Sequence, residues 1–260
     1  MFETSAPPFD AVDVQGYRRD GYLIARDVFT PREVEAMDAE ATRLLQRTDL
    51  IDTNNIRCRW QDDIVSGECR FDCFDPVIDL SPVFESVARD ARLLGLMSAL
   101  FGERAYLFKD KLIFKPANAK GYSLHQDYIA WPSFPKSFTT LIVAIDPSDA
   151  ASGGTEVFPG QHANGNLTAP DGNYHDLPEF LVAGTPGIVL ELEAGDIAVF
   201  DGFMPHRSAS NRSGRSRRLL YLSYNADRDG GEQREAHYTE FKAWLQAQYA
   251  KHNRTDTFFR

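Results

Sequence analysis

Cysteine is scarce in this chain: its 260 residues include only Cys58, Cys69 and Cys73. An odd number of cysteines cannot pair completely within one chain, and small secreted domains that depend on disulfides contain many more. The spacing of Cys69 and Cys73 could serve a zinc site, but no histidine or further cysteine stands close by to complete the ligands. We therefore expect reduced thiols without a functional role, in a cytoplasmic protein.

Long hydrophobic runs and an excess of positive charge are also absent. No run approaches the roughly 18 apolar residues that a transmembrane helix needs, and residues 1–13 lack the basic start and apolar core of a signal peptide. The formal net charge is −10, whereas nucleic-acid binding requires clustered cations that displace counterions. The one basic cluster, residues 212–218, is short. We expect neither a membrane nor a nucleic-acid partner.

The composition, 43% hydrophobic and 25% charged, is that of an ordinary globular protein. No internal repeat, heptad series or low-complexity tract divides the chain. We expect a single domain over residues 1–260, with a helical N-terminal part over about 1–104, a core over about 105–226 and a C-terminal helix over about 234–250.

Helical patterns gather near the two ends. Thr30 and Glu33 form a capping box that predicts a helix start. A second helical region is predicted over about 81–100, with Gly102 placed to end it. Between these helices and the C-terminal one, the pattern changes to short strands over residues 105–115, 122–129, 139–146, 155–158, 188–191, 196–203 and 219–225. This arrangement predicts a mainly β fold, a jelly-roll sandwich covered by helices.

Two segments do not follow these patterns. Residues 160–187 are rich in Gly, Asn, Asp and Pro and are predicted to form a surface loop or lid. Residues 49–79 mix arginines and aromatic residues with acidic ones and show no clear period. We expect this second segment to fold over the mouth of the core, where specificity is set.

His125 and Asp127 are the strongest candidates for chemistry. In a strand, residues i and i+2 point to the same face, so both side chains could hold one metal while Gln126 points away. A chance His-x-Asp pair is the competing interpretation, but the triplet falls on a predicted strand. His206 follows the apolar run 197–203, where a neighbouring strand could end beside the first. Non-haem Fe(II) oxygenases bind iron through two imidazoles and one carboxylate, which leave coordination positions on the metal open for other ligands.

An iron enzyme that activates O2 needs electrons, and a keto acid that chelates the metal supplies two by decarboxylation. The second carboxylate of such a co-substrate needs a cation. Arg217 lies at the start of the last predicted strand, and its guanidinium can bind a carboxylate through two hydrogen bonds. Ser208 could add a hydroxyl donor. The alternative is a solvated basic turn over residues 212–218, since strand alternation separates Arg217 from Arg218 without showing which faces inward.

At this point several segments together resemble the phytanoyl-CoA dioxygenase family. They are residues 108–116, His125-Gln126-Asp127, residues 153–162, and Pro205-His206 with Arg217. The resemblance extends from Gly21 to Asn225. One departure is Pro159-Gly160-Gln161-His162, where the family usually has Pro-Gly-Ser-His.

The resemblance implies a double-stranded β-helix fold and Fe(II) bound by His125, Asp127 and His206. It also implies 2-oxoglutarate held by Arg217 with help from Ser208. In this family a polar residue on the strand before the metal motif often contacts 2-oxoglutarate too, and two residues match that position: Lys109 and Lys111. The implied reaction is oxidation of a small molecule, most often hydroxylation, with O2 consumed and succinate and CO2 released. Similar halogenases replace the metal carboxylate with a small residue, so Asp127 favours oxygen chemistry.

Enzymes similar to this one hydroxylate fatty acyl-CoA, ectoine, aminoalkylphosphonates and natural products, so the resemblance sets neither the substrate nor the oligomeric state. An anionic substrate would suit four cations, if they point into the mouth: Arg57, Arg59, Lys109 and Lys111. A flat or apolar scaffold would suit three aromatic residues: Tyr128, Trp131 and Phe134. The absence of an extended basic surface for CoA phosphates favours a small polar or natural-product substrate.

Two other classes of protein stay open at this stage. One is a cupin-type metalloenzyme that does not use 2-oxoglutarate, and Arg217 is the residue that distinguishes it. The other is a non-catalytic binding protein with the same fold. The intact set of metal ligands counts against this second alternative.

Overall fold

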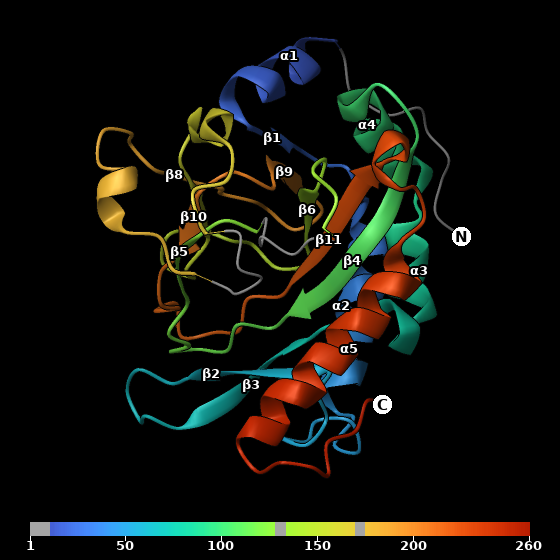
Figure 1. Ribbon diagram of the computed structural model, residues 1–260, viewed down its shortest axis with the longest axis vertical. Helices are drawn as coiled ribbons and strands as arrows, with labels where there is room; N and C mark the ends of the chain where they lie inside the picture. The colour runs from blue at the N-terminus through green and yellow to red at the C-terminus, as the bar shows by residue number, and fades with distance from the viewer. Residues whose placement is uncertain (1–10, 128–133, 170–174) are drawn as a thin grey trace.

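Two antiparallel sheets form the centre of the structure, a computed structural model that describes residues 11–127, 134–169 and 175–260 (Figure 1). The larger sheet has seven strands in the order β1 (Tyr22–Ala25), β9 (Ile197–Asp201), β6 (Thr139–Ala144), β11 (Leu219–Ala226), β4 (Ala105–Ile113), β3 (Cys69–Phe74) and β2 (Cys58–Asp62). The smaller sheet has four, in the order β5 (Tyr122–His125), β10 (His206–Ser208), β7 (Thr155–Val157) and β8 (Ile188–Val189). This arrangement is the predicted jelly-roll sandwich.

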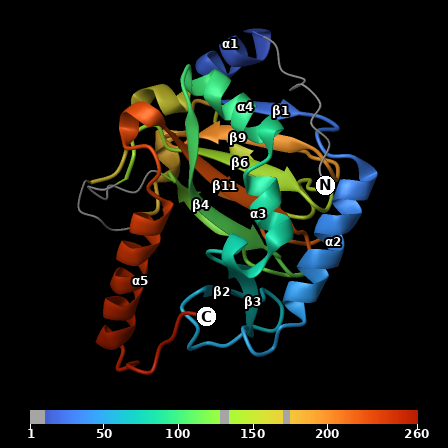
Figure 2. The same cartoon turned by 90° about the vertical axis from the view of Figure 1, so that its right-hand side faces the viewer.

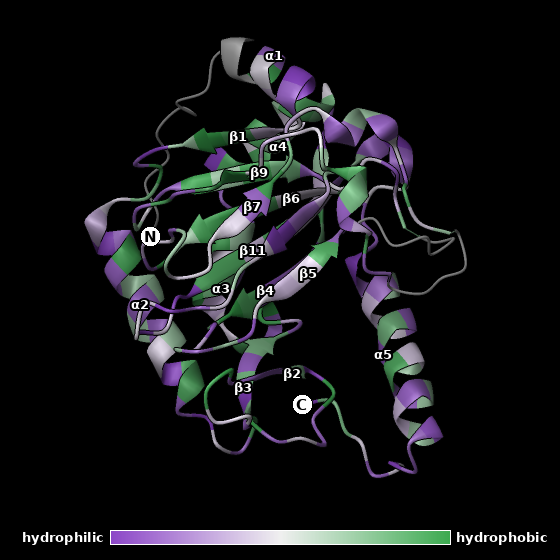
Figure 3. Ribbon diagram, turned by 90° about the vertical axis from the view of Figure 1, so that its left-hand side faces the viewer, coloured by the Kyte–Doolittle hydropathy of each residue, from purple (hydrophilic) through white to green (hydrophobic). Residues whose placement is uncertain are grey.

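Side chains that alternate across the strands of the larger sheet divide the interior into two cores. On β11, Leu220 and Leu222 pack beneath the helices, whereas Leu219 and Tyr221 belong to the core shared with the smaller sheet. Figure 3 shows β9 as largely hydrophobic, as a strand covered on both faces should be. Figure 2 shows the helices on the first face: α2 (Pro31–Leu45), α3 (Pro82–Ala88) and α4 (Ala91–Phe101).

Local sequence signals set the ends of these helices. The Thr30 hydroxyl accepts from the Glu33 amide, and the Glu33 carboxylate accepts from the Thr30 amide at 2.7 Å, which completes the predicted capping box. Asp90 caps α4 and separates it from α3. Gly102 ends α4 with a φ of 74°, in the left-handed region that favours glycine.

Two further helices lie near the ends of the chain: α1 (Ala11–Asp20) and α5 (Arg234–Lys251). The sequence predicted α5 but not α1. Tyr238, Phe241 and Leu245 form the buried side of α5. Short 3₁₀ helices are η1 (Ile78–Leu80), η2 (Gln161–Asn164), η3 (Glu179–Leu181) and η4 (Asp227–Asp229). No helix in the described part of the chain is both long enough and apolar enough to cross a membrane.

The segment 49–79, which has no clear period in the sequence, contains the hairpin β2–β3. Its strand β3 pairs with β4, with Cys73 opposite Ile113, so the hairpin extends the larger sheet. The part of the chain predicted to be helical therefore also supplies strands to the sheet. A second difference concerns the strand predicted over 122–129, since β5 ends at His125.

Candidate active site

His125, Asp127 and His206 converge between the two sheets. His206 on β10 lies directly opposite His125 on β5, and one ligand atom from each of the three residues lies within 4.8 Å of the others. The Asp127 Oδ1 atom is 3.7 Å from the His206 Nε2 atom and 4.0 Å from that of His125. Asp127 stands just beyond the end of β5, so the expectation that one regular strand carries both residues was wrong, although they meet as expected.

Backbone carbonyls orient both imidazoles. The Nδ1 atom of His125 lies 2.7 Å from the Ser123 carbonyl, and that of His206 lies 2.9 Å from the Met204 carbonyl. Because a carbonyl only accepts, each Nδ1 carries the proton and each Nε2 presents a lone pair. Burial, with help from His206 and against Asp127, lowers the pKa of His125 to about 3. Both rings are therefore neutral, as metal ligation requires.

The Asp127 carboxylate is held in its charged form. Burial opposes ionisation, but His206, Lys111 and His125 outweigh it, so the pKa of Asp127 lies below its usual range. The Thr140 hydroxyl donates to the Oδ2 atom at 2.6 Å, while the Oδ1 atom faces the histidines. Two neutral imidazoles and one oriented carboxylate form a donor set that fits a divalent transition metal.

A cavity of about 530 Å³ opens beside these ligands. Its size is that of a small-molecule site. Strands of both sheets build its walls, and the hairpin β2–β3 contributes one edge. The side chains around it include Trp60, Gln61, Lys109, Lys111, Ile113, Tyr122, Phe134, Phe138, Thr155, Ser208, Tyr221 and Ser223. On β4 and β11 the wall residues have odd numbers, as strand alternation requires.

Arg217 points towards the interior, whereas Arg218 points away. The side chain of Arg217 is buried and is not among the residues that line the cavity, and its Nη2 atom donates to the Gly153 carbonyl at 3.1 Å. Its Nε and Nη1 atoms are buried without a hydrogen-bond partner among the described residues. Arg218 is instead paired with Asp146 at 2.6 Å and with Asp38 at 2.5 Å. A basic turn exposed to solvent over residues 212–218 is therefore excluded for Arg217.

Lys109 and Lys111 both lie in the cavity wall. The Lys109 Nζ atom is 3.0 Å from Asp75 Oδ2 and 4.3 Å from the centre of the Phe241 ring. The Lys111 Nζ atom lies 5.1 Å from the centre of the Tyr221 ring, and within the described ranges no carboxylate lies close enough to Lys111 for an ion pair.

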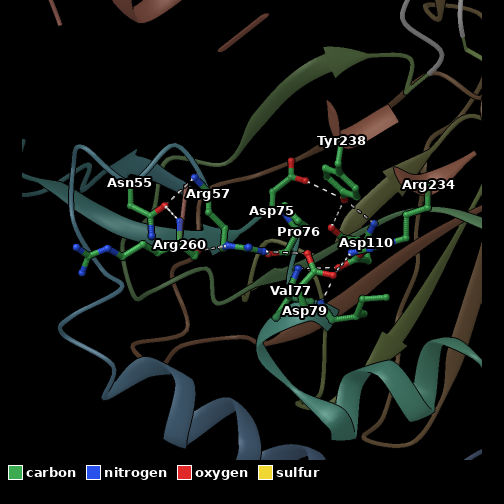
Figure 4. A network of polar contacts seen from close by, with 11 residues as sticks. Asn55, Arg57, Asp75, Pro76, Val77, Asp79, Asp110, Arg234, Tyr238 and Arg260 are labelled. Atoms are coloured by element: carbon green, nitrogen blue, oxygen red, sulfur yellow. Dashed lines mark hydrogen bonds and ion pairs between the residues drawn. The ribbon is translucent and has the colours of Figure 1, made fainter. Parts of the chain in front are cut away.

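Arg57 and Arg59 are not among the residues that line the cavity, so the condition under which they would bind an anionic substrate is not met. Arg57 is covered by the C-terminal segment: it donates to the Arg260 carbonyl and to the Pro76 carbonyl at 2.8 Å (Figure 4). Arg59 donates to the Ile56 carbonyl at 2.6 Å. Both side chains hold loops together around β2.

The three aromatic candidates divide into two groups. Phe134 lies in the cavity wall and packs against Phe108 and Phe138. Tyr128 and Trp131 lie outside the described residues.

The sequence did not single out two residues that the structure places around the site. Gln126, expected only to point away, donates to the Gly165 carbonyl at 2.8 Å and accepts from the Leu167 amide, which fastens the following loop to the metal motif. Lys115 is completely buried next to Arg217 and donates to Ser208. In the sequence, the one signal that could have identified Lys115 is the presence of a lysine within the run 112–115, which is buried in the structure.

Several characterised proteins are similar in sequence. The chain is 34% identical to a 2-aminoethylphosphonate dioxygenase from an uncultured bacterium over 140 residues, which cover 53% of this chain and 52% of the relative. It is 32% identical to a methylphosphonate hydroxylase from Gimesia maris, over 55% of this chain and 53% of that protein. These two matches span about half the length of the relatives. An ectoine dioxygenase from Streptomyces anulatus is 27% identical over 84% of this chain and 79% of its own.

Solved structures show the same fold. The epimerase SnoN in complex with Fe3+, alpha ketoglutarate and nogalamycin RO superposes with a TM-score of 0.70 at 22% identity, covering 83% of this chain and 82% of that one. EctD from S. alaskensis with 2-oxoglutarate and 5-hydroxyectoine also superposes with a TM-score of 0.70. The identity is 23%, and the match covers 87% of this chain and 79% of that one. The family model for phytanoyl-CoA dioxygenase matches residues 17–219, which is most of the chain. The chain therefore belongs to the phytanoyl-CoA dioxygenase (PhyH) family.

Proposed function

We propose that the protein is an Fe(II)- and 2-oxoglutarate-dependent dioxygenase that hydroxylates a small molecule. The observation that carries this proposal is the convergence of His125, Asp127 and His206, in the protonation states of metal ligands, beside a cavity of small-molecule size. Three relatives or neighbours support it by their names, which describe phosphonate and ectoine oxidation and a structure that contains 2-oxoglutarate.

In this proposal the three ligands hold Fe(II), and the rest of the site orients them. The carbonyls of Ser123 and Met204 fix the imidazoles, and Thr140 fixes the carboxylate. When bound, iron and 2-oxoglutarate supply the oxidising power that no side chain here provides. The chain contributes binding, orientation and exclusion of water from the cavity.

Arg217 and Ser208 are the proposed partners of the far carboxylate of 2-oxoglutarate. A buried guanidinium with unpaired N–H groups costs several kcal/mol unless an acceptor meets it. Arg217 has two such N–H groups, and Ser208 lies in the cavity wall close by. A planar carboxylate would satisfy both donors of Arg217 at once.

We further propose that the substrate carries an anionic group such as a carboxylate or phosphonate. Asp75 is shared between Lys109 at 3.0 Å and Arg59 at 3.7 Å, so one carboxylate faces two cations. Lys111 has Asp127 as its strongest electrostatic partner, and that carboxylate is committed to the metal in this proposal. The wall formed by Lys109 and Lys111 therefore carries surplus positive charge.

The first test is spectroscopic. Anaerobic protein supplied with Fe(II) and 2-oxoglutarate should develop a visible metal-to-ligand charge-transfer band, and the His206→Ala variant should not. Folded wild-type protein that binds Fe(II) but shows no band would contradict the use of 2-oxoglutarate and favour a cupin-type enzyme. Protein that binds neither would favour a non-catalytic role.

The second test addresses the substrate. 2-Aminoethylphosphonate and ethylamine, which lacks the phosphonate, would be compared for their ability to raise succinate release above the uncoupled background. We expect stimulation by the phosphonate that the Lys109→Met and Lys111→Met variants reduce and that Lys120→Met, at the exposed rim of the same cavity, retains. Equal stimulation by the compounds with and without the phosphonate group would contradict an anionic substrate.

A further inference from the structure

Lys115 is a buried lysine outside the proposed metal and substrate contacts. It is 0% exposed, and its Nζ atom lies 2.7 Å from the Gly153 carbonyl, 2.7 Å from the Ala209 carbonyl and 2.9 Å from the Ser208 hydroxyl. These bonds use all three N–H groups of an ammonium. No carboxylate in the described part of the chain lies within ion-pair distance of it, although the buried Asp72 interacts with it electrostatically. Burial and the charge of Arg217 lower the pKa of Lys115 to about 6. Lysine is almost never fully buried without an ion-pair partner, so this position needs an explanation.

The backbone around Lys115 is strained to place it there. Its φ is 35°, in the region that side-chain-bearing residues rarely adopt, at a cost of about 1–3 kcal/mol. The amide of Arg217 holds the segment by donating to the Phe114 and Lys115 carbonyls at 3.1 and 3.2 Å. A Cβ atom at Gly153 would stand 2.6 Å from the Lys115 Nζ atom. The fold therefore leaves room for this ammonium and little else.

The hydrogen bond to Ser208 sets the direction of the serine proton. An anion bound beside Arg217 would favour the charged form of Lys115, and a charged lysine cannot accept a hydrogen bond. In that form the Ser208 oxygen accepts from Lys115, and the Ser208 O–H must point elsewhere. Ser208 forms part of the cavity wall, which makes the cavity the open direction. An acceptor placed there would receive an oriented hydroxyl donor.

The hydrogen bond to Gly153 links Lys115 with Arg217. The same carbonyl accepts from Lys115 Nζ at 2.7 Å and from Arg217 Nη2 at 3.1 Å. This contact anchors one end of the guanidinium and leaves Nε and Nη1 without a partner in the described chain. Ser208 and Arg217 are thus arranged around the Lys115 side chain, although they come from different segments of the chain.

We propose that Lys115 is a positioning residue for the co-substrate carboxylate: it orients the Ser208 hydroxyl and, through the Gly153 carbonyl, the Arg217 guanidinium towards one anion. The inference rests on the proposed function for the identity of that anion, 2-oxoglutarate. Lys115 itself does not touch the co-substrate, because its three N–H groups are already used.

The test measures 2-oxoglutarate binding by calorimetry to protein loaded with Co(II), which does not support turnover and whose absorption reports the metal site. Lys115→Met should weaken 2-oxoglutarate binding by roughly 10- to 100-fold, the range expected for hydrogen bonds that involve charged groups. The Co(II) spectrum and Co(II) affinity should stay unchanged. Lys115→Gln, which retains two N–H donors, should bind 2-oxoglutarate with an affinity between those of wild type and Lys115→Met. If Met at this position prevents folding, the Lys115→Gln variant is used in its place.

A double-mutant cycle with Ser208→Ala separates positioning from direct contact. If Lys115 acts by orienting Ser208, the double variant should bind 2-oxoglutarate no more than about twofold worse than the weaker single variant. If the losses of affinity in the two single variants multiply in the double variant, the inference is overturned.

Asn211→Ala is the matched control. Its side-chain amide donates to the carbonyls of Lys115, Pro116 and Arg215, so it holds the same loop without touching Ser208 or Arg217. We expect a lower melting temperature and an affinity for 2-oxoglutarate within about twofold of wild type. An equal loss of affinity in Asn211→Ala would attribute the effect to a loosened loop and refute the positioning role. Wild-type protein that does not bind 2-oxoglutarate would refute the proposed function instead, whereas binding that is unchanged in Lys115→Met refutes only this inference.

Discussion

Arg92 and Arg217 are both almost fully buried, at 4% and 2% exposure, yet their surroundings differ in charge. Arg92 donates to Asp90 at 2.9 Å and to Glu33 at 2.7 Å, and it also bonds the Val28 carbonyl, so it joins α2, α4 and the loop before α2. Arg217 has one carbonyl partner and no carboxylate in the described residues.

The difference separates a structural cation from a ligand-binding one. A buried charge is tolerated when carboxylates compensate it, as around Arg92. Around Arg217 the fold supplies a hydrogen-bond anchor but no carboxylate within ion-pair distance, and burial raises the pKa of the nearby Asp72 despite Arg217, which favours its uncharged form. We therefore infer that an anion from outside the chain completes this site. Arg218, the next residue along the strand, is paired with Asp146 and so belongs to the structural class.

The largest expected effect is on stability, from Arg92→Met. This change leaves the carboxylates of Glu33 and Asp90 buried without their cation, which costs about 3–5 kcal/mol. Urea denaturation followed by circular dichroism would measure it. The protein that remains folded should bind 2-oxoglutarate with wild-type affinity, and a change below about 1 kcal/mol would remove the distinction between the two arginines.

Arg217→Met should show the opposite pattern. We expect 2-oxoglutarate affinity to fall roughly 100-fold, because a buried charged hydrogen-bond partner of the carboxylate is lost. Stability without ligand should fall much less than in Arg92→Met, since no carboxylate within ion-pair distance loses its cation. Calorimetry with Co(II)-loaded protein and urea denaturation would test the two parts. If the variant is strongly destabilised but still binds 2-oxoglutarate, Arg217 is a structural cation like Arg92.

His237 is a third kind of buried ionisable group, one that stays uncharged. Burial lowers its pKa to about 3, with Lys109 adding to the effect. Because the folded pKa lies below the unfolded value of about 6.5, its contribution to stability is complete above pH 6.5 and is lost as the pH falls towards 3. Between pH 8 and pH 5 this loss is about 2 kcal/mol. His237→Phe should lose less stability than wild type over this interval in urea titrations, whereas identical pH dependence would show that His237 is not the group responsible.

The smallest expected effect comes from the partly exposed end of the Arg218 ion pair. Asp38 is 52% exposed, and Asp146 still compensates Arg218 when Asp38 is removed. Asp38→Ala should therefore destabilise the protein by less than about 1 kcal/mol. A loss as large as that of Arg92→Met would mean that exposure does not weaken ion pairs in this fold.

Features set by local sequence were predictable. The capping box at Thr30 depends on contacts within one turn, and the spacing of His125 and Asp127 belongs to one short segment. The sequence could not show which of Arg217 and Arg218 points into the interior. The alternation of side chains along a strand requires only that the two point to opposite faces. The surroundings of Arg57 could not be predicted, because the residue whose carbonyl it binds lies 203 residues further along the chain. The acceptors of Lys115 are likewise distant in sequence, so no pattern within its strand could reveal its role.

Strand β4 has two functions on opposite faces. Lys109 and Ile113 face the cavity, whereas the buried Asp110 between them accepts from the Val77 and Ile78 amides and binds Arg234 of α5 at 2.7 Å (Figure 4). For protein engineering, this arrangement divides one strand into variable and fixed positions. A combinatorial library that randomises residues 109 and 113 and retains Asp110 would explore new substrates while the C-terminal helix stays attached.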